Sequence, residues 1–345
     1  MSKGKAKAAT DKRINLALQG GGAHGAFSWG IIDRLLDEEW LSFDGIVGTS
    51  AGAMNAAVMA YGLTVDGRRG ARACLHQFWK TVSDAAKTSP LQPSFLDKMM
   101  GPGNMDLSPA FFMFDTLSRV MSPYQLNPTN LNPLRDALAA VVDFAVLRRT
   151  PGNPLFICAT NVRNGRMKVF ERHEITVEAV MASACLPFIF QAVEVDGEFY
   201  WDGGYMGNPA IYPLIYNTET QDVLIAQINP INIPEVPKTA FAIADRMSTL
   251  SWNASLMREM RAIHFVSKLI DGGFDDDGKL RKVFIHTIDA EDELVKYSVS
   301  SKLNADWDWL QHLFRCGQER AEAFLSAHAD KIGRESSTDI EAKFL

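Results

Sequence analysis

Two glycine-rich turns near the start of the chain constrain its fold most strongly. The first follows the apolar run INLALQ at 14–19 and precedes a helical pattern over 26–40. The second, at 48–52, follows FDGIV and precedes a small-residue helix that we expect to end near Gly62. Strands and helices that alternate in this way favour a mostly parallel sheet covered by helices. The sequence therefore predicts an α/β fold.

The rest of the chain continues this alternation with one long interruption. Further strands are predicted at 155–160, 167–170, 192–201, 223–228 and 283–288, and further helices at 177–185, 236–272 and 303–328. Residues 64–145 lack strand patterns and are interpreted as a helical insertion. We predict a flexible basic arm at 1–13, one domain at 14–290 that carries the insertion, and a helical extension at 291–345 packed on that domain.

Composition excludes several classes of function. The 345 residues are 47% hydrophobic and carry a formal net charge of -6, so nothing favours binding to nucleic acid. The four cysteines have no CxxC spacing, and we expect neither a metal site nor a cofactor. No signal peptide and no run of about 20 apolar residues is predicted. We expect a cytoplasmic protein whose contact with membranes, if any, is peripheral.

The first glycine turn, GGGAHG at 20–25, is compatible with two kinds of site. It satisfies G-x-G-x-x-G between a strand and a helix, where a dinucleotide pyrophosphate can bind. That fingerprint also requires an acidic residue at the carboxyl end of the next strand. Asp44 has the right spacing but precedes the apolar Ile46 and Val47, so it lies at the wrong end. The nucleotide hypothesis therefore loses its second support.

The second turn, GTSAG, matches the G-x-S-x-G pattern of a nucleophilic serine. Gly48 and Gly52 permit a sharp turn that exposes the Ser50 hydroxyl at the start of a helix. In a parallel sheet both turns lie at the same edge, so the amides of Gly21 and Gly22 can point at a group bound to Ser50. Such donors stabilise the oxyanion of acyl transfer.

Two residues are candidates for the base that activates Ser50. His286 follows the strand-like KVFI, in the chain order of an α/β-hydrolase triad. Asp202 follows an aromatic run and precedes Gly203 and Gly204, so we expect it on a tight turn at a strand end. The residues themselves leave both candidates open.

Together these motifs resemble those of the patatin-like phospholipase family. The family pattern G-G-G-x-[R/K]-G, then G-x-S-x-G, then D-G-[G/A] maps onto 20–25, 48–52 and 202–204, and the resemblance spans 14–230. Softer similarities are Ala159-Thr160-Asn161, Ser183-Ala184-Cys185-Leu186-Pro187 and Asn208-Pro209. The resemblance implies a three-layer α/β sandwich with a mostly parallel central sheet and helical insertions.

The resemblance also implies a Ser-Asp dyad without a histidine. Ser50 would be the nucleophile, Asp202 its base, and Gly20, Gly21 and Gly22 the oxyanion hole, with Gly25, Gly48, Gly52, Gly203 and Gly204 supporting the motifs. His24 is a departure, because the family has Arg or Lys there, and we expect it either to assist the oxyanion side or to face solvent.

We expect a serine acyl hydrolase that cleaves fatty-acyl esters of lipids. Its partners would be a lipid or other acyl-ester substrate, a membrane surface at most, and no nucleic acid; an oligomer is compatible with this function. The first alternative is a Ser50-Asp202-His286 hydrolase acting on another ester or thioester. The second is a lipid- or nucleotide-binding protein without catalysis.

Overall fold

A single mixed sheet organises the chain in the computed structural model, which describes residues 11–101, 103–274 and 277–345. Its strands are β1 (Lys12–Leu18), β2 (Leu41–Gly48), β3 (Leu155–Asn161), β4 (Met167–Glu171), β5 (Val193–Val195), β6 (Glu198–Asp202), β7 (Asp222–Gln227) and β8 (Phe284–Asp289). The order is β5-β6-β3-β2-β1-β7-β8, and β4 pairs with β3. The strands from β3 to β8 along this order are parallel, whereas β4, β5 and β6 pair antiparallel.

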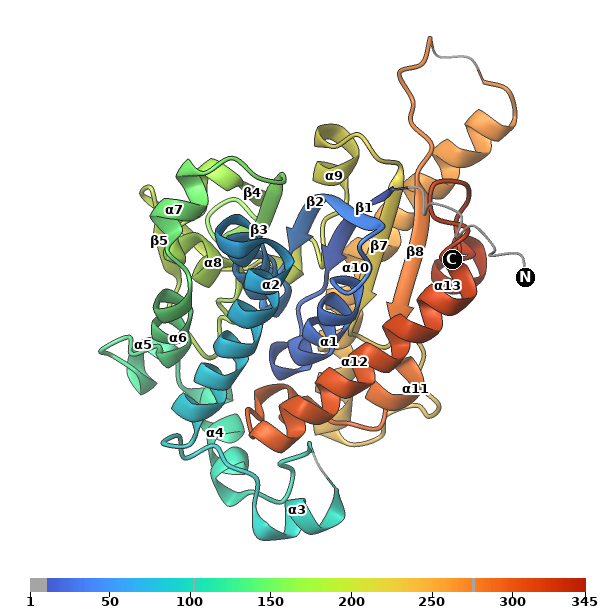
Figure 1. Cartoon of the computed structure of the whole chain (residues 1–345). Coiled ribbons are helices and arrows are strands. Elements are labelled where there is room, and N and C mark those ends of the chain that lie inside the picture. The colour runs from blue at the N-terminus through green and yellow to red at the C-terminus, as the bar shows by residue number, and fades with distance from the viewer. Residues whose placement is uncertain (1–10, 102, 275–276) are drawn as a thin grey trace, which may run out of the picture.

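Helices cover both faces of the sheet. They are α1 (Gly25–Leu35), α2 (Ala51–Ala86), α3 (Phe95–Met100), α4 (Pro109–Val120), α5 (Pro123–Leu126), α6 (Pro133–Val141), α7 (Phe144–Arg149), α8 (Val177–Ser183), α9 (Tyr212–Asn217), α10 (Ala240–Asp271), α11 (Glu291–Leu294), α12 (Trp307–His328) and α13 (Ile340–Phe344). Short 3-10 turns are η1 (Gly22–His24), η2 (Arg172–Glu174), η3 (Gly203–Tyr205) and η4 (Val299–Leu303). In Figure 1, α1, α2 and α12 lie in front of the sheet and α10 lies behind it.

Two hydrophobic clusters, one on each side of the sheet, explain the layers. Alternate strand residues face opposite sides: Leu16 and Leu18 of β1 pack with α1, α2 and α12, whereas Ala17 packs with Leu256 and Met260 of α10 and with α9 and α13. The architecture is the expected three-layer α/β sandwich with a mostly parallel central sheet.

The structure corrects several boundaries. The helix expected to end near Gly62 continues to Ala86, with a kink at Asp66 and Gly67, because both halves pack on the same core. The run 192–201 is a hairpin of β5 and β6 instead of one strand, because Asp196 and Gly197 adopt positive φ and turn the chain. Of the expected arm, Lys12 and Arg13 belong to β1 and residues 1–10 lie outside the described residues.

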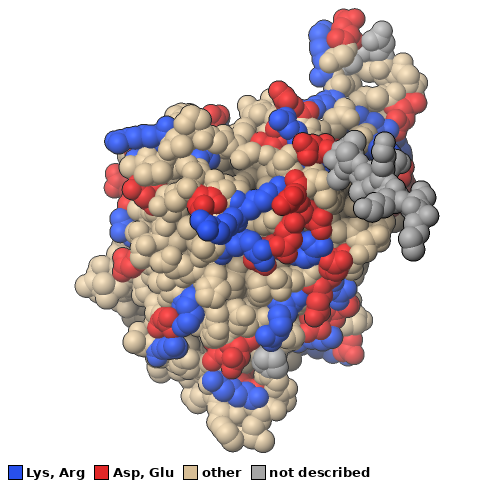
Figure 2. Space-filling model, in the orientation of Figure 1, with Lys and Arg blue, Asp and Glu red and all other residues tan. Residues whose placement is uncertain are grey.

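Charges are mixed over the surface of the molecule. Basic and acidic side chains lie beside one another across the face drawn in Figure 2, whereas the lower tip, which α3 forms, is largely uncharged. There Phe95, Met99 and Met100 are exposed. Within the described residues, no helix has the length and apolar character needed to cross a membrane.

Candidate active site

Ser50 lies on the sharp turn between β2 and α2. Its φ is 56° and its ψ is -124°, a conformation that side-chain-bearing residues rarely adopt and that marks a strained functional turn. The flanking glycines are required by contact: a Cβ on Gly48 would lie 2.3 Å from the Gly52 carbonyl oxygen, and one on Gly52 would lie 2.2 Å from the Leu18 oxygen. The G-x-S-x-G pattern thus encodes a strand-to-helix elbow that packs against β1.

Asp202 ends β6 and is completely buried. Its backbone N–H donates to the Cys185 carbonyl at 2.8 Å, and its carbonyl accepts from Thr160 Oγ1 at 2.8 Å. Its Oδ1 accepts the Gly204 N–H at 2.8 Å, while Oδ2 has no hydrogen-bond partner among the described residues. One carboxylate oxygen is therefore held in place and the other is left for a proton.

Burial raises the pKa of Asp202 to about 7, because the charged carboxylate has lost its water. The Gly204 N–H and the Ser50 hydroxyl, which stabilise the anion, oppose this rise. Ser50 thus lies near enough to act on the carboxyl, although its contact does not meet the geometry of a hydrogen bond. Catalytic hydrogen bonds are often loose before substrate binds. The site brings together a serine and a carboxyl group suited to act as a base near neutral pH.

The first glycine turn lies directly against Ser50. A Cβ on Gly20 would come within 2.5 Å of the Ser50 Cβ. The Gly20 N–H donates to Asn208 Oδ1 at 2.6 Å, so it is occupied. The N–H groups of Gly21 and Gly22 make no hydrogen bond to any residue between 11 and 345 that the structure describes. The structure thus leaves two of the three expected oxyanion donors available.

His24 neither faces solvent nor carries a charge near neutral pH. It has 2% of its surface exposed, and its Nε2 contacts Ser301 Oγ at 2.7 Å. Burial first, and then the positive charge of Lys302, lower the pKa of His24 to about 3. The cation that the family pattern has at this position is therefore not supplied by His24.

Three residues that the sequence analysis quoted only as softer similarities hold the site together. Ser183 Oγ accepts the Ser50 N–H at 2.9 Å, and Asn208 and Thr160 fix Gly20 and Asp202 as described above. Their sequence separation from their partners ranges from 42 to 188 residues. Their place in the family pattern was the one signal that pointed to them.

An apolar cavity of about 510 Å³ begins beside the first glycine turn, 20–25, which we call the oxyanion loop after its expected role. Gly21 and Gly22 line one end, and further walls come from α4, α10, η4 and the segment after α8. Its side chains are mainly apolar: Phe111, Phe114, Leu186, Pro187, Phe188, Ile189, Trp252, Val299 and Leu303. Ser50 itself has 5% of its surface exposed, lies against Gly20 and is not among the residues that line the cavity. The cavity can hold a hydrocarbon chain.

The alternative residues are placed elsewhere. His286 lies within β8, where its two ring nitrogens contact Asp222 Oδ1 and Ser337 Oγ, both at 2.9 Å. Two strands, β7 and β1, separate β8 from the strand that leads to Ser50. Asp44 lies near the start of β2, where its Oδ2 accepts the N–H groups of Glu219 and Thr220. Neither residue reaches the glycine turns.

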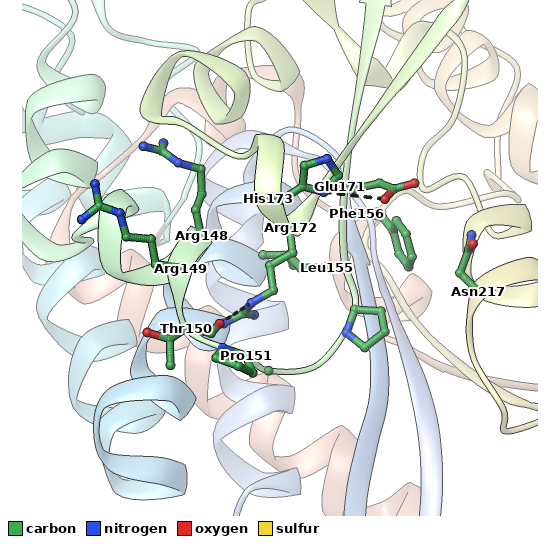
Figure 3. A pocket seen from close by; sticks show the side chains of 12 residues that line it. Arg148, Arg149, Thr150, Pro151, Leu155, Phe156, Glu171, Arg172, His173 and Asn217 are labelled. Carbon is green, nitrogen blue, oxygen red and sulfur yellow. Dashed lines mark hydrogen bonds and ion pairs between the residues drawn. The ribbon is translucent and has the colours of Figure 1, made fainter.

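A second hollow, of about 500 Å³, lies at the other edge of the sheet, near the start of β3 (Figure 3). Its central cation, Arg172, donates to the carbonyls of Thr150 and Asn153 and to Thr64 Oγ1, so it joins the segment before β3 to helix α2. The side chains of Arg148 and Arg149 point away from the hollow (Figure 3). Across the described part of the chain, no three His, Cys, Asp or Glu side chains are grouped as metal ligands would be.

Comparisons with known proteins show the family to which the sequence is similar. The sequence model of the family described as patatin-like phospholipase matches residues 16–215. A comparison with curated proteins found no match. Among solved structures, VipD from Legionella pneumophila is 15% identical with a TM-score of 0.36, and the match covers 91% of this chain and 72% of VipD. The heterodimeric ExoU-SpcU complex from the type III secretion system of Pseudomonas aeruginosa is also 15% identical, with a TM-score of 0.36 and coverage of 94% and 53%.

Proposed function

The chain belongs to the patatin-like phospholipase family, and we propose that it hydrolyses fatty-acyl esters of lipids with a Ser50-Asp202 dyad. The observation that carries the proposal is the buried Asp202 carboxyl: Gly204 fixes one oxygen, the other has no hydrogen-bond partner among the described residues, and Ser50 lies near enough to stabilise the charged form. No third residue is needed to orient the base, because the Gly203-Gly204 turn holds the carboxylate directly.

Two acyl transfers follow from this arrangement. Ser50 Oγ attacks the ester carbonyl while the hydroxyl proton of Ser50 passes to Asp202. The oxyanion accepts hydrogen bonds from the N–H groups of Gly21 and Gly22. The carbonyl–alkoxy bond then breaks, and Asp202 gives its proton to the leaving alcohol. Water next attacks the acyl-serine and gives a proton to Asp202, which returns it to Ser50 as the fatty acid leaves.

The apolar cavity supports a substrate with a long acyl chain. Its aromatic and aliphatic walls would bury each methylene with a gain of about 0.8 kcal/mol, whereas a short acyl group would leave most of the volume unfilled. This difference favours a lipid ester over a small soluble ester or a thioester of a short acid.

The pH dependence of Ser50 reactivity tests the dyad. Since only the ionised Asp202 accepts a proton, the rate of Ser50 labelling by a fluorophosphonate should rise about tenfold per pH unit below 7 and level off between pH 7 and 7.5. Intact-mass spectrometry over pH 5–7.5 measures this rate. A rate that is flat down to pH 5 would mean that a carboxyl with an ordinary pKa, or no base at all, activates the serine, and would contradict the proposal.

Exposed apolar side chains beside the cavity support a further part of the proposal, that the lipid is taken from a membrane surface. Helix α4 lines the cavity with Phe111 and Phe114 and exposes Met113 and Val120. We expect the protein to float with neutral phospholipid vesicles, and Met113→Ser with Val120→Ser to reduce the floated fraction several-fold, because burial of these side chains is lost. Val65→Ser, on an exposed site of α2, is the matched control. Flotation that is equal in all three proteins would exclude this face.

A further inference from the structure

The orientation of one peptide unit decides whether the oxyanion loop can function. The Gly20 carbonyl and the Gly21 N–H belong to the same peptide, and in a planar trans unit they point in opposite directions. A group that binds the carbonyl therefore fixes the direction of the N–H. The structure shows such a group behind the loop, in a part of the chain beyond the residues that match the family.

Asn229, just after β7, is that group. Its Nδ2 donates to the Gly20 carbonyl at 2.8 Å, and its own N–H donates to Gln19 Oε1 at 2.9 Å. Its Oδ1 accepts from Lys302 Nζ at 2.8 Å. Asn229 Oδ1 faces the ammonium of Lys302, and Asn229 Nδ2 faces the Gly20 carbonyl. These two partners determine the orientation of the buried amide.

Lys302 is also packed against the loop that it serves. It belongs to η4, and a Cβ on Gly22 would lie 2.3 Å from its carbonyl oxygen and 3.4 Å from its Cβ. Its side chain is half-buried and lines the cavity next to Gly21 and Gly22. The positive charge of Lys302 thus lies next to the oxyanion loop, whose own histidine, His24, is neutral.

We propose that Lys302 is a positioning residue for the oxyanion hole, acting through Asn229 on the Gly20-Gly21 peptide. The chain of bonds runs from the ammonium to Asn229 Oδ1, from Asn229 Nδ2 to the Gly20 carbonyl, and from the Gly21 N–H to the developing oxyanion. Hydrogen bonds in such a chain polarise one another, and a charged donor at its head strengthens the last bond where negative charge appears. The inference rests on the proposed hydrolase function and assigns a role to the C-terminal segment in it.

Substitution of Lys302 tests the inference through rates. We expect Lys302→Met to lower kcat for a soluble p-nitrophenyl ester about 10- to 100-fold, with KM changed less than twofold, because the effect arises in the transition state. Phosphonylation of Ser50, in which Oγ–P forms and P–F breaks, should slow by a similar factor. Lys302→Arg should restore most of the loss, and Lys87→Met, which removes an exposed lysine of a surface ion pair, should change neither rate.

The pH dependence of the Ser50 labelling rate gives a second test, in a protein that keeps Lys302. Burial lowers its pKa to about 8, and the negative Asp245 of α10 opposes this fall. Other charged or titratable groups near it are the neutral His24 of η1 and the Asp115–Arg119 ion pair of α4, which lines the same cavity. A neighbouring hollow, which Lys302 also lines, adds Asp106, Glu235, Lys238, Arg246, Lys296 and Tyr297. The labelling rate should therefore fall as the pH rises through about 8, and Asp245→Asn should move this alkaline limb to lower pH.

The outcomes separate the inference from the proposed function. If Ser50 is labelled in the wild type but Lys302→Met reacts equally fast, the role of Lys302 is overturned and the proposed hydrolase function stands. The same holds if Asp245→Asn leaves the alkaline limb unmoved. A loss of rate in Lys302→Met that Lys302→Arg does not restore, with a lowered melting temperature in both, assigns Lys302 to structure and also overturns it. Wild-type protein that is folded and unlabelled at Ser50 removes the function itself.

Discussion

Replacement of Ser50 by alanine is expected to abolish hydrolysis of lipid esters and labelling by fluorophosphonate together. We expect kcat to fall about 10⁵-fold or more, because removal of a nucleophile leaves only the contribution of the oxyanion hole and of binding. Assay of fatty-acid release from phosphatidylcholine, with intact-mass analysis after labelling, measures both effects on one preparation.

Ser28→Ala is the matched control for that substitution. Ser28 lies on α1 and is buried like Ser50, and its hydroxyl has no hydrogen-bond partner among the described residues. Its removal should leave activity and labelling unchanged. Fatty-acid release that survives in Ser50→Ala at more than about 1% of the wild-type rate would show that another residue is the nucleophile.

Replacement of Asp202 by asparagine is expected to slow labelling of Ser50 and ester hydrolysis by about 10²- to 10⁴-fold, the usual range for loss of a general base. An amide oxygen can still accept the Gly204 N–H, so the turn after β6 keeps its shape. The acid limb of the pH profile should disappear with the carboxyl group. Labelling rates between pH 5 and 7.5, compared with wild type, check both effects.

Glu259→Gln separates Asp202 from another carboxyl group of similar pKa, which is half-buried. Burial raises the pKa of Glu259 to about 7 as well, against the stabilising effect of the N–H groups of Ile211 and Tyr212. Glu259 lies on α10 and is not part of the dyad, so its substitution should leave the acid limb in place. An acid limb that vanishes in Glu259→Gln and persists in Asp202→Asn would show that Glu259, and not Asp202, is the titrating group. This result would contradict the dyad.

Sequence reasoning succeeded where a structure is encoded by neighbouring residues. The elbow at Ser50 needs a glycine two residues before and two after it, and contacts at those positions confirm the reason. Strands β1, β2, β3, β4, β7 and β8 lie where apolar residues gather in the sequence. The clearest of them, β3 and β7, are buried along their whole length, as strands covered on both faces are, whereas β4 is largely only half-buried. Helix α2 was predicted too short. The chain stays helical at Gly62, where an end was expected, and a second helical half follows the kink at Asp66 and Gly67.

The sequence by itself identified the residues that we propose to take part: the elbow serine, the aspartate before Gly203, and the glycine loop, all in motifs of local spacing. The tertiary structure alone decided their chemical state and their support. Burial and contacts between segments up to 277 residues apart decide four properties of the site. They are the pKa of Asp202 near 7, the neutral state of His24, the occupied Gly20 N–H and the place of Lys302 beside the loop. Desolvation and long-range hydrogen bonds are properties of packing, and packing is fixed only when the sheet brings these segments together.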